Sequence, residues 1–312
     1  MKLPLVIDTD PGIDDALALM LAARADRSRL LAVSITYGNT TLDRATRNAR
    51  IVLARTARPV PVFPGADRPL ARALVTAKET HGGEGLGDNE APAPEPVAPS
   101  QTSILDALRA AGEPATLVTL GPLTNLALAL RHDAAFVRSR VVRHVAMAGN
   151  IAAAGNSGGL AEFNVWCDPE AAAEVLAAGL GTELVGLDVT RRLVITAPAV
   201  ERLAAATDPQ AQWLGRLLGF YVRFHHHFEG LPGAVINDPL AVALALEPAW
   251  GRAERMHLRV NLAAEAGRGE ITAGASSAPS LAVYRDVSLP AVHALLLRHL
   301  FGAWLTESDF LP

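Results

Sequence analysis

Several residue types are scarce in this chain of 312 residues, and each scarcity excludes a class of protein. A single cysteine, Cys167, excludes an internal disulfide and fits a reducing compartment, so we expect a cytoplasmic protein. No apolar run approaches the ~20 residues of a membrane span, and the first residues lack the layout of a signal peptide. The formal net charge of -4 argues against general affinity for nucleic acid. We therefore expect neither a membrane nor a nucleic acid among the partners.

Half of the residues are hydrophobic, and short apolar runs alternate with longer segments rich in alanine and leucine. Strands are expected at residues 3–8, 31–36, 60–63, 115–120, 141–148, 183–187 and 256–261. Helices are expected at residues 14–25, 43–54, 102–111, 123–131 and 169–178. This alternation predicts an α/β fold, a mostly parallel sheet flanked by helices and related to the Rossmann fold. We expect a single domain over residues 1–312, with a helical cap at 193–235 and a proline-rich surface loop at 89–99.

Four aspartates occur within the eight residues 8–15, which read DTDPGIDD. An apolar strand leads into this segment, and Asp14 and Asp15 begin a helix, where free N–H groups and the helix dipole favour negative charge. A single aspartate at that place is ordinary capping. Four carboxylates at one strand end repel one another unless some are protonated or a cation neutralises them. Hard oxygen ligands in this number indicate Ca²⁺ or Mg²⁺.

A second interpretation of the segment is the nucleophile loop of haloacid-dehalogenase-type phosphatases, which carries Asp-x-Asp after the first strand. Such an enzyme needs a later lysine against the phosphate, and Lys78 is the only lysine after Lys2. This interpretation also gives no reason for Asp14 and Asp15. We keep the phosphatase as the alternative enzyme.

Residues 8–16, DTDPGIDDA, resemble the signature of the inosine–uridine-preferring nucleoside hydrolases. Further segments follow in that family's order: YGN at 37–39, HGGEGLG at 81–87, GPLTN at 121–125, AEFN at 161–164, DPEAA at 168–172, GLDVT at 186–190 and NDPLAV at 237–242. Each segment is weak evidence alone, but their occurrence in order is specific. The resemblance implies calcium-dependent hydrolysis of the N-glycosidic bond of ribonucleosides to free base and ribose, by a homodimer or homotetramer.

The resemblance also implies how the metal is held. Its ligands would be Asp10, Asp15, Asp238 and the backbone carbonyl of Leu120. Such an ion lowers the pKa of a bound water and orients it toward the sugar. Asp10 is placed to accept the proton of that water, which attacks the anomeric carbon through an oxocarbenium-like transition state.

A further set of residues is expected, by the same resemblance, to bind the nucleoside substrate. These residues are Asp14, Asn39, Asn156, Glu162, Asn164 and Asp238. Carboxylates and amides suit this task because several ribose hydroxyls need paired donors and acceptors in a site that excludes water. An isolated Asn after Gly, as at Asn39 and Asn156, is typical of a turn. The proximity of Glu162 and Asn164 to Asn156 in the sequence favours the binding role.

One residue departs from the family's pattern. Most members have histidine before the last metal aspartate, as the acid that protonates the leaving base. Here that residue is Asn237, whose amide can donate a hydrogen bond but no proton at neutral pH. If the acid is lost, the chain is a non-hydrolytic nucleoside- or ribose-binding protein.

Three alternatives would let the chain remain an enzyme without a histidine at position 237. His81, in a glycine-rich loop that resembles a closing flap, is a candidate catalytic acid. The helix that carries Tyr221 and His225 on one face, four residues apart, can supply another donor. A substrate with a better leaving group needs no acid.

Overall fold

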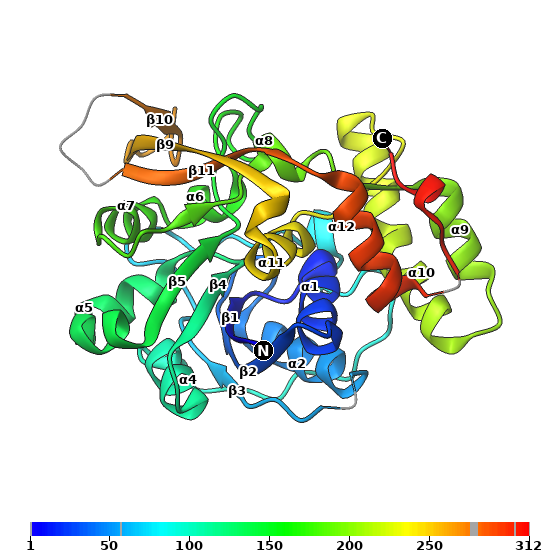
Figure 1. The fold of residues 1–312 in the computed structure, drawn as a ribbon, viewed down its shortest axis with the longest axis horizontal. Coiled ribbons are helices and arrows are strands. Elements are labelled where there is room, and N and C mark those ends of the chain that lie inside the picture. Colours follow the sequence, from blue (N-terminus) through cyan, green and yellow to red (C-terminus); the bar gives the residue numbers. More distant parts are fainter. Residues whose placement is uncertain (1, 57, 275–279, 303, 312) are drawn as a thin grey trace.

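The computed structural model describes residues 2–56, 58–274, 280–302 and 304–311. The main strands are β1 (Leu3–Thr9), β2 (Ser28–Ile35), β3 (Val62–Pro64), β4 (Ala115–Thr119), β5 (Val141–Ala146), β6 (Glu183–Leu184), β9 (Gly251–Val260), β10 (Ile271–Ala273) and β11 (Ser280–Val287). Over the described residues they form one nine-stranded sheet in the order β10-β9-β11-β6-β5-β4-β1-β2-β3 (Figure 1). Every pairing from β11 to β3 is parallel, whereas β9 is antiparallel to both neighbours. The predicted α/β class and mostly parallel sheet are confirmed.

Helices cover both faces of this sheet (Figure 1). The core of one face includes residues of α1 (Ile13–Arg24), α2 (Leu42–Ala54), α11 (Asp238–Leu246) and α12 (Leu289–Leu296). The core of the other face includes residues of α4 (Ser103–Ala111), α5 (Thr124–Arg140) and α7 (Pro169–Ala177). Successive strand residues supply the two cores in turn, with Leu5 and Ile7 in the first and Val6 in the second. Burial on both faces explains why the central strands read as continuous apolar runs.

The segment 193–235 is largely helical, as expected of a cap. Helices α9 (Ala197–Ala205) and α10 (Pro209–Phe224) pack on each other, and α10 continues into a π-helical turn, η1 (His225–Glu229). The sequence pattern misses two short strands here. β7 (Val194–Thr196) pairs antiparallel with β8 (Gly233–Val235), which closes the segment at its base. This pairing returns the chain to the start of α11.

Other differences from the predicted elements lie toward one edge of the sheet. Residues 183–187 form only the two-residue β6, because α8 (Leu187–Thr190) begins at the end of this stretch. Residues 256–261 fall within the longer β9, and the sequence pattern misses its partner β11 and the edge strand β10. Half of the residues of β9 are exposed, and only one is fully buried, so its sequence lacks the apolar signal of a buried strand. Residues 89–99 form neither helix nor strand, as predicted. Among the described helices, none is long and apolar enough to cross a membrane.

One buried amide joins the ends of neighbouring strands. The side chain of Asn125, in the first turn of α5, donates to the carboxylate of Asp8 at 2.8 Å and to the carbonyl of Ile35 at 3.0 Å. It also accepts from the backbone N–H of Ala66 at 2.8 Å. The chain segments at the ends of β1, β2 and β3 are therefore tied to one side chain.

Asn125→Ala should lower the free energy of unfolding by roughly 3 kcal/mol, because buried partners left without a hydrogen bond cost about 1–3 kcal/mol each. Urea unfolding followed by circular dichroism measures this change. Gln101→Ala, at an exposed position, is the control and should stay within about 0.5 kcal/mol of the wild type. Equal stability of Asn125→Ala and the wild type would contradict the assigned role.

Candidate active site

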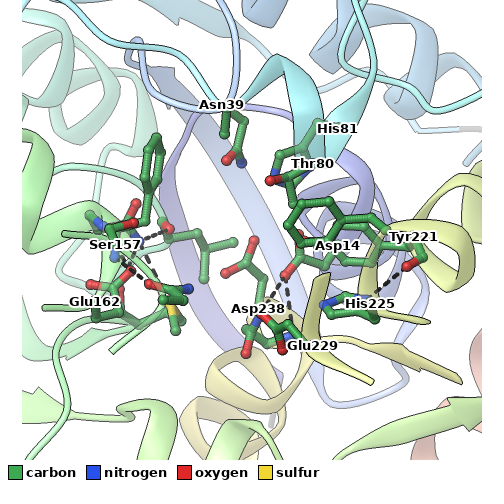
Figure 2. Close-up of a pocket in the computed structure, with 18 residues that line it drawn as sticks. Asp14, Asn39, Thr80, His81, Ser157, Glu162, Tyr221, His225, Glu229 and Asp238 are labelled. Carbon is green, nitrogen blue, oxygen red and sulfur yellow. Dashed lines mark hydrogen bonds between the residues drawn. The ribbon is translucent and has the colours of Figure 1, made fainter. Parts of the chain in front are cut away.

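One pocket lies at the carboxyl edge of the parallel strands, against α10 and η1 (Figure 2). Its sheet side is lined by Asp14, Asn39, Leu120, Met147, Asn156, Glu162, Asn164, Asn237 and Asp238. Its other side is lined by Thr80 and His81 of the α3 region (Lys78–His81), by Tyr221 and Phe224 of α10, and by His225 and Glu229 of η1. Figure 2 shows Glu162 and Ser157 on one side of the pocket and Tyr221 and His225 on the opposite side. Residues predicted from distant motifs thus meet in one place.

The floor of this site is a group of buried carboxylates. Asp14, Asp15 and Asp238 each present an oxygen within 4.8 Å of the others. Burial and the neighbouring carboxylates raise the pKa of Asp238 well above its ordinary value and that of Asp15 to about 6. Both shifts mean that these two carboxyl groups resist losing their protons while no cation lies between them. The group can hold its full charge only if a cation compensates for it.

Asp10 lies beside this group and is fully buried. Its Oδ2 accepts the backbone N–H of Asn39 at 2.6 Å, whereas its Oδ1 has no hydrogen-bond partner. A Cβ on Gly38 would lie 2.1 Å from Oδ2, and a Cβ on Gly121 would lie 2.5 Å from Oδ1. These two glycines therefore let the backbone close around the carboxylate. Burial, followed by the charge of Asp15, raises the pKa of Asp10 well above its ordinary value.

Two of the predicted sugar ligands also organise the carboxylates. The side-chain amide of Asn39 donates to Asp15 at 2.7 Å, so Asn39 orients Asp15 as well as lining the pocket. Asp14 accepts the Tyr221 hydroxyl at 2.9 Å on one oxygen. Its other oxygen accepts the backbone N–H of Asn237 at 3.1 Å and the side-chain amide at 3.3 Å. Asp14 therefore links α1 to the cap and to the start of α11.

The wall opposite the cap is built around a helix start. Glu162 accepts the backbone N–H groups of Asn164 at 2.7 Å and Gly149 at 2.9 Å, which fixes its carboxyl group. Burial raises the pKa of Glu162 to about 7, against the effect of these donors. The amide of Asn164 donates to the carbonyl of Leu120 at 2.7 Å, and the side chain of Asn156 accepts a backbone N–H at 2.9 Å. The predicted residues of this wall all line the pocket.

Several pocket residues lie outside the recognised motifs. Phe224 and Glu229 are such residues, although Phe224 follows Tyr221 at the i+3 spacing of a helix face, a signal that could have identified it. The motif GLDVT also had no assigned role. Its Asp188 accepts the backbone N–H groups of Ile151 and Ala152 at 2.7 and 2.8 Å. This carboxylate therefore holds the start of the loop that carries Asn156.

The lysine required by the phosphatase interpretation does not reach the site. The side chain of Lys78 is 71% exposed and lies 4.0 Å from Glu79. Among the pocket residues that the structure describes, none is a lysine. The aspartates therefore have no cationic side chain to hold a phosphate against them, and this alternative gains no support.

Comparison with known proteins gives a consistent result. Residues 5–294 match a family model described as inosine-uridine preferring nucleoside hydrolase. The pyrimidine-specific ribonucleoside hydrolase RihA of Shewanella sp. (strain ANA-3) is 39% identical over 254 residues, which cover 80% of this chain and 79% of that protein. RihA of Salmonella enteritidis PT4 is 37% identical over 253 residues, which cover 80% of this chain and 81% of that protein.

Solved structures show the same likeness. A plant nucleoside hydrolase, PpNRh1, is 26% identical with a TM-score of 0.87, and the match covers 97% of this chain and 100% of that chain. A purine-preferring ribonucleoside hydrolase from Gardnerella vaginalis is 24% identical with a TM-score of 0.86, over 96% of this chain and 99% of that chain. At 24% identity, the similarity to the Gardnerella vaginalis enzyme shows a shared fold only.

Asn39→Asp should lower the free energy of unfolding in the absence of divalent cations by roughly 3 kcal/mol or more, because it places an uncompensated carboxylate against buried Asp15. Asn156→Asp is the matched control. It keeps the oxygen that accepts the N–H of Phe163 at an exposed position, so we expect a change below about 1 kcal/mol. Urea unfolding in chelator measures both. Equal stability of the two variants would contradict the assigned role of Asn39.

Proposed function

Because the chain belongs to the family of inosine–uridine-preferring nucleoside hydrolases and is thus a ribonucleoside hydrolase, we propose that it cleaves pyrimidine ribonucleosides with the help of bound Ca²⁺. The buried carboxylate group, with the unpartnered Oδ1 of Asp10, is the observation that carries the metal. The pyrimidine preference is supported by the 39% and 37% identity to relatives named pyrimidine-specific. The homodimer or homotetramer implied by the resemblance stays a prediction.

The residues of the floor fit a divalent cation. The proposed ligands are Asp10, Asp15, Asp238 and the carbonyl of Leu120, which together offer the hard oxygen atoms that Ca²⁺ prefers. The raised pKa values of Asp15 and Asp238 reflect buried negative charge that a cation would compensate. Asp14 also lies close, but its oxygens already accept three hydrogen bonds from Tyr221 and Asn237. When bound, the ion would lower the pKa of a water and polarise the ribose hydroxyls.

The side chains around the ion would accept the proton of the water and bind the ribose. Asp10 accepts the proton of the attacking water through Oδ1, which no protein donor occupies. Asp14, Asn39, Asn156, Glu162, Asn164 and Asp238 are the proposed contacts of the ribose. Backbone groups hold the side chains of Glu162 and Asn164, and a backbone N–H bonds the side chain of Asn156, so the sugar meets a preformed wall on this side. Such a wall holds the anomeric carbon against the water and stabilises the oxocarbenium-like transition state.

Asp10→Asn should lower kcat for uridine by at least about 100-fold, since a general base contributes about 10²–10⁴-fold. The matched control is Asp8→Asn, the same change two residues earlier. Burial raises the pKa of Asp8 to about 7, so a neutral amide is a close substitute there. We expect kcat of this control within about threefold of the wild type.

A reducing-sugar assay measures ribose release from uridine, cytidine and inosine, before and after treatment with a chelator. We expect release to be fastest from the two pyrimidines, to stop in chelator and to return with Ca²⁺. Chelator-insensitive release, or an Asp10→Asn variant as active as the wild type, would contradict the metal mechanism. A preference for inosine would contradict only the proposed choice of base.

A further inference from the structure

Asn237 leaves the reaction without a proton donor at the place where the family usually has one. Its backbone N–H and its side-chain amide both donate to the same oxygen of Asp14, at 3.1 and 3.3 Å. An amide does not release a proton at neutral pH. A leaving base must therefore be protonated from another side of the pocket. Among the described residues of the cap-side wall, the ring N–H and phenol groups belong to His81, Tyr221 and His225.

His81 is held in its neutral form. The backbone N–H of Ile13 donates to His81 Nδ1 at 3.0 Å, so the ring proton is on Nε2. A second proton would place two N–H donors against each other. Burial lowers the pKa of His81 to about 4, in agreement with this geometry. His81 can therefore donate a hydrogen bond to the substrate, but no proton at neutral pH.

The phenol of Tyr221 is already engaged. Its hydroxyl donates to Asp14 Oδ1 at 2.9 Å. Burial and the nearby carboxylates raise the pKa of Tyr221 well above its ordinary value, so it releases its proton less readily than a free phenol. Tyr221 is thus a positioning residue for Asp14 and a weak candidate for the acid.

His225 has the geometry that the other two lack. Its Nδ1 lies 2.9 Å from the backbone carbonyl oxygen of Tyr221, an atom that can only accept. Nδ1 therefore carries a proton, and Nε2 is the atom at which the ring gains and loses the second one. The ring is buried and lines the pocket, beside Asp14 and Glu229 in Figure 2. The change from α10 to the π-helical turn η1 occurs at this residue, and such turns recur at functional sites.

The titratable groups around His225 come from four parts of the chain. Glu229 of η1 and Asp14 of α1 favour its cationic form, whereas Arg191 after α8 opposes it. Neutral His81 of the α3 region lies near as well. Burial lowers the pKa of His225, and Glu229, the Tyr221 carbonyl and Asp14 counteract this effect. Because Glu229 also forms an ion pair with Arg191, the opposing cation is partly compensated.

We propose that His225, through Nε2, protonates the base as it leaves, and this role rests on the proposed function. As the bond between C1′ and the base nitrogen breaks, its electron pair stays with the base, and the Nε2 proton moves to the base. Water forms the new bond to C1′ and gives its proton to Asp10. Asp10 then releases that proton to solvent and His225 takes one up. Each turnover therefore consumes one water and no other reactant.

The test compares two leaving groups. Uridine needs its base protonated, whereas p-nitrophenyl β-D-ribofuranoside releases a stable anion without an acid. His225→Gln should lower kcat for uridine about 100-fold and change the rate on the nitrophenyl riboside less than about threefold, since only the first reaction needs general acid catalysis. His226→Gln, at the exposed next position of the same turn, is the matched control and should leave both rates near those of the wild type.

The pH dependence of the wild type supplies a second test that needs no variant. The cationic form of His225 is the donor, so kcat for uridine should fall as the pH rises through the pKa of His225. The nitrophenyl riboside should not show this fall, because its reaction uses no acid. An equal loss on both substrates in His225→Gln would overturn the proposal in favour of a structural role. An unchanged rate on uridine in that variant would place the acid elsewhere. A wild type that releases ribose from neither substrate would overturn the proposed function and the role of His225 with it.

Discussion

The mutual repulsion of four buried carboxylates is the constraint on which the rest of this site depends. Asp10, Asp14, Asp15 and Asp238 lie together because β1 ends where α1 and α11 begin, at the carboxyl edge of the sheet. Neighbouring segments stabilise these carboxylates. Gly38 and Gly121 lack the Cβ that would collide with Asp10, and Asn39 donates hydrogen bonds to Asp10 and Asp15. Burial and mutual repulsion raise the pKa values of Asp15 and Asp238, so without a compensating cation these groups resist losing their protons. A fold that maintains such a group is organised to bind a metal.

The two sides of the pocket are built differently, which suits a reaction with a constant sugar and a variable base. The sheet side is fixed by backbone contacts, such as those that hold Glu162 and Asn164. The cap side consists of side chains from the α3 region, from α10 and from the π-helical turn η1, which begins at His225 and ends at Glu229. Asp14 joins the two sides through Tyr221 and Asn237. One carboxylate therefore connects the proposed sugar-binding side of the pocket with the helix that carries the proposed acid.

The sequence predicts the central strands and the floor of the site because both leave local signals. Buried parallel strands are continuous apolar runs, and the aspartates follow the first of them directly. Only the second half of β9 is predicted, because half of its residues are exposed, and β7 and β8 escape prediction because each has three residues. The sequence pattern also misses β11, the neighbour of β9. The roles of Asn125 and Asp188 escape for another reason. Each depends on backbone groups from distant segments, which no local pattern records.

Which of His81, Tyr221 and His225 is placed to act as the acid likewise depends mainly on contacts between distant segments. All three can carry a proton, and the sequence offers no means to rank them. Their partners separate them: an N–H donor faces His81, a carboxylate engages Tyr221, and a carbonyl faces His225. The partner atom in each hydrogen bond thus determines whether the side chain can give a proton to the leaving base.

The central claim, that a divalent cation replaces protons among the buried carboxylates, is tested most directly by calorimetric titration of Ca²⁺ into chelator-treated protein. Titrations at neutral pH in two buffers of different ionisation enthalpy count the protons released. We expect one bound ion per chain and the release of about one proton, because carboxyl groups with raised pKa values must lose their protons to bind the metal. The absence of binding, or binding whose heat is the same in both buffers, would contradict the account.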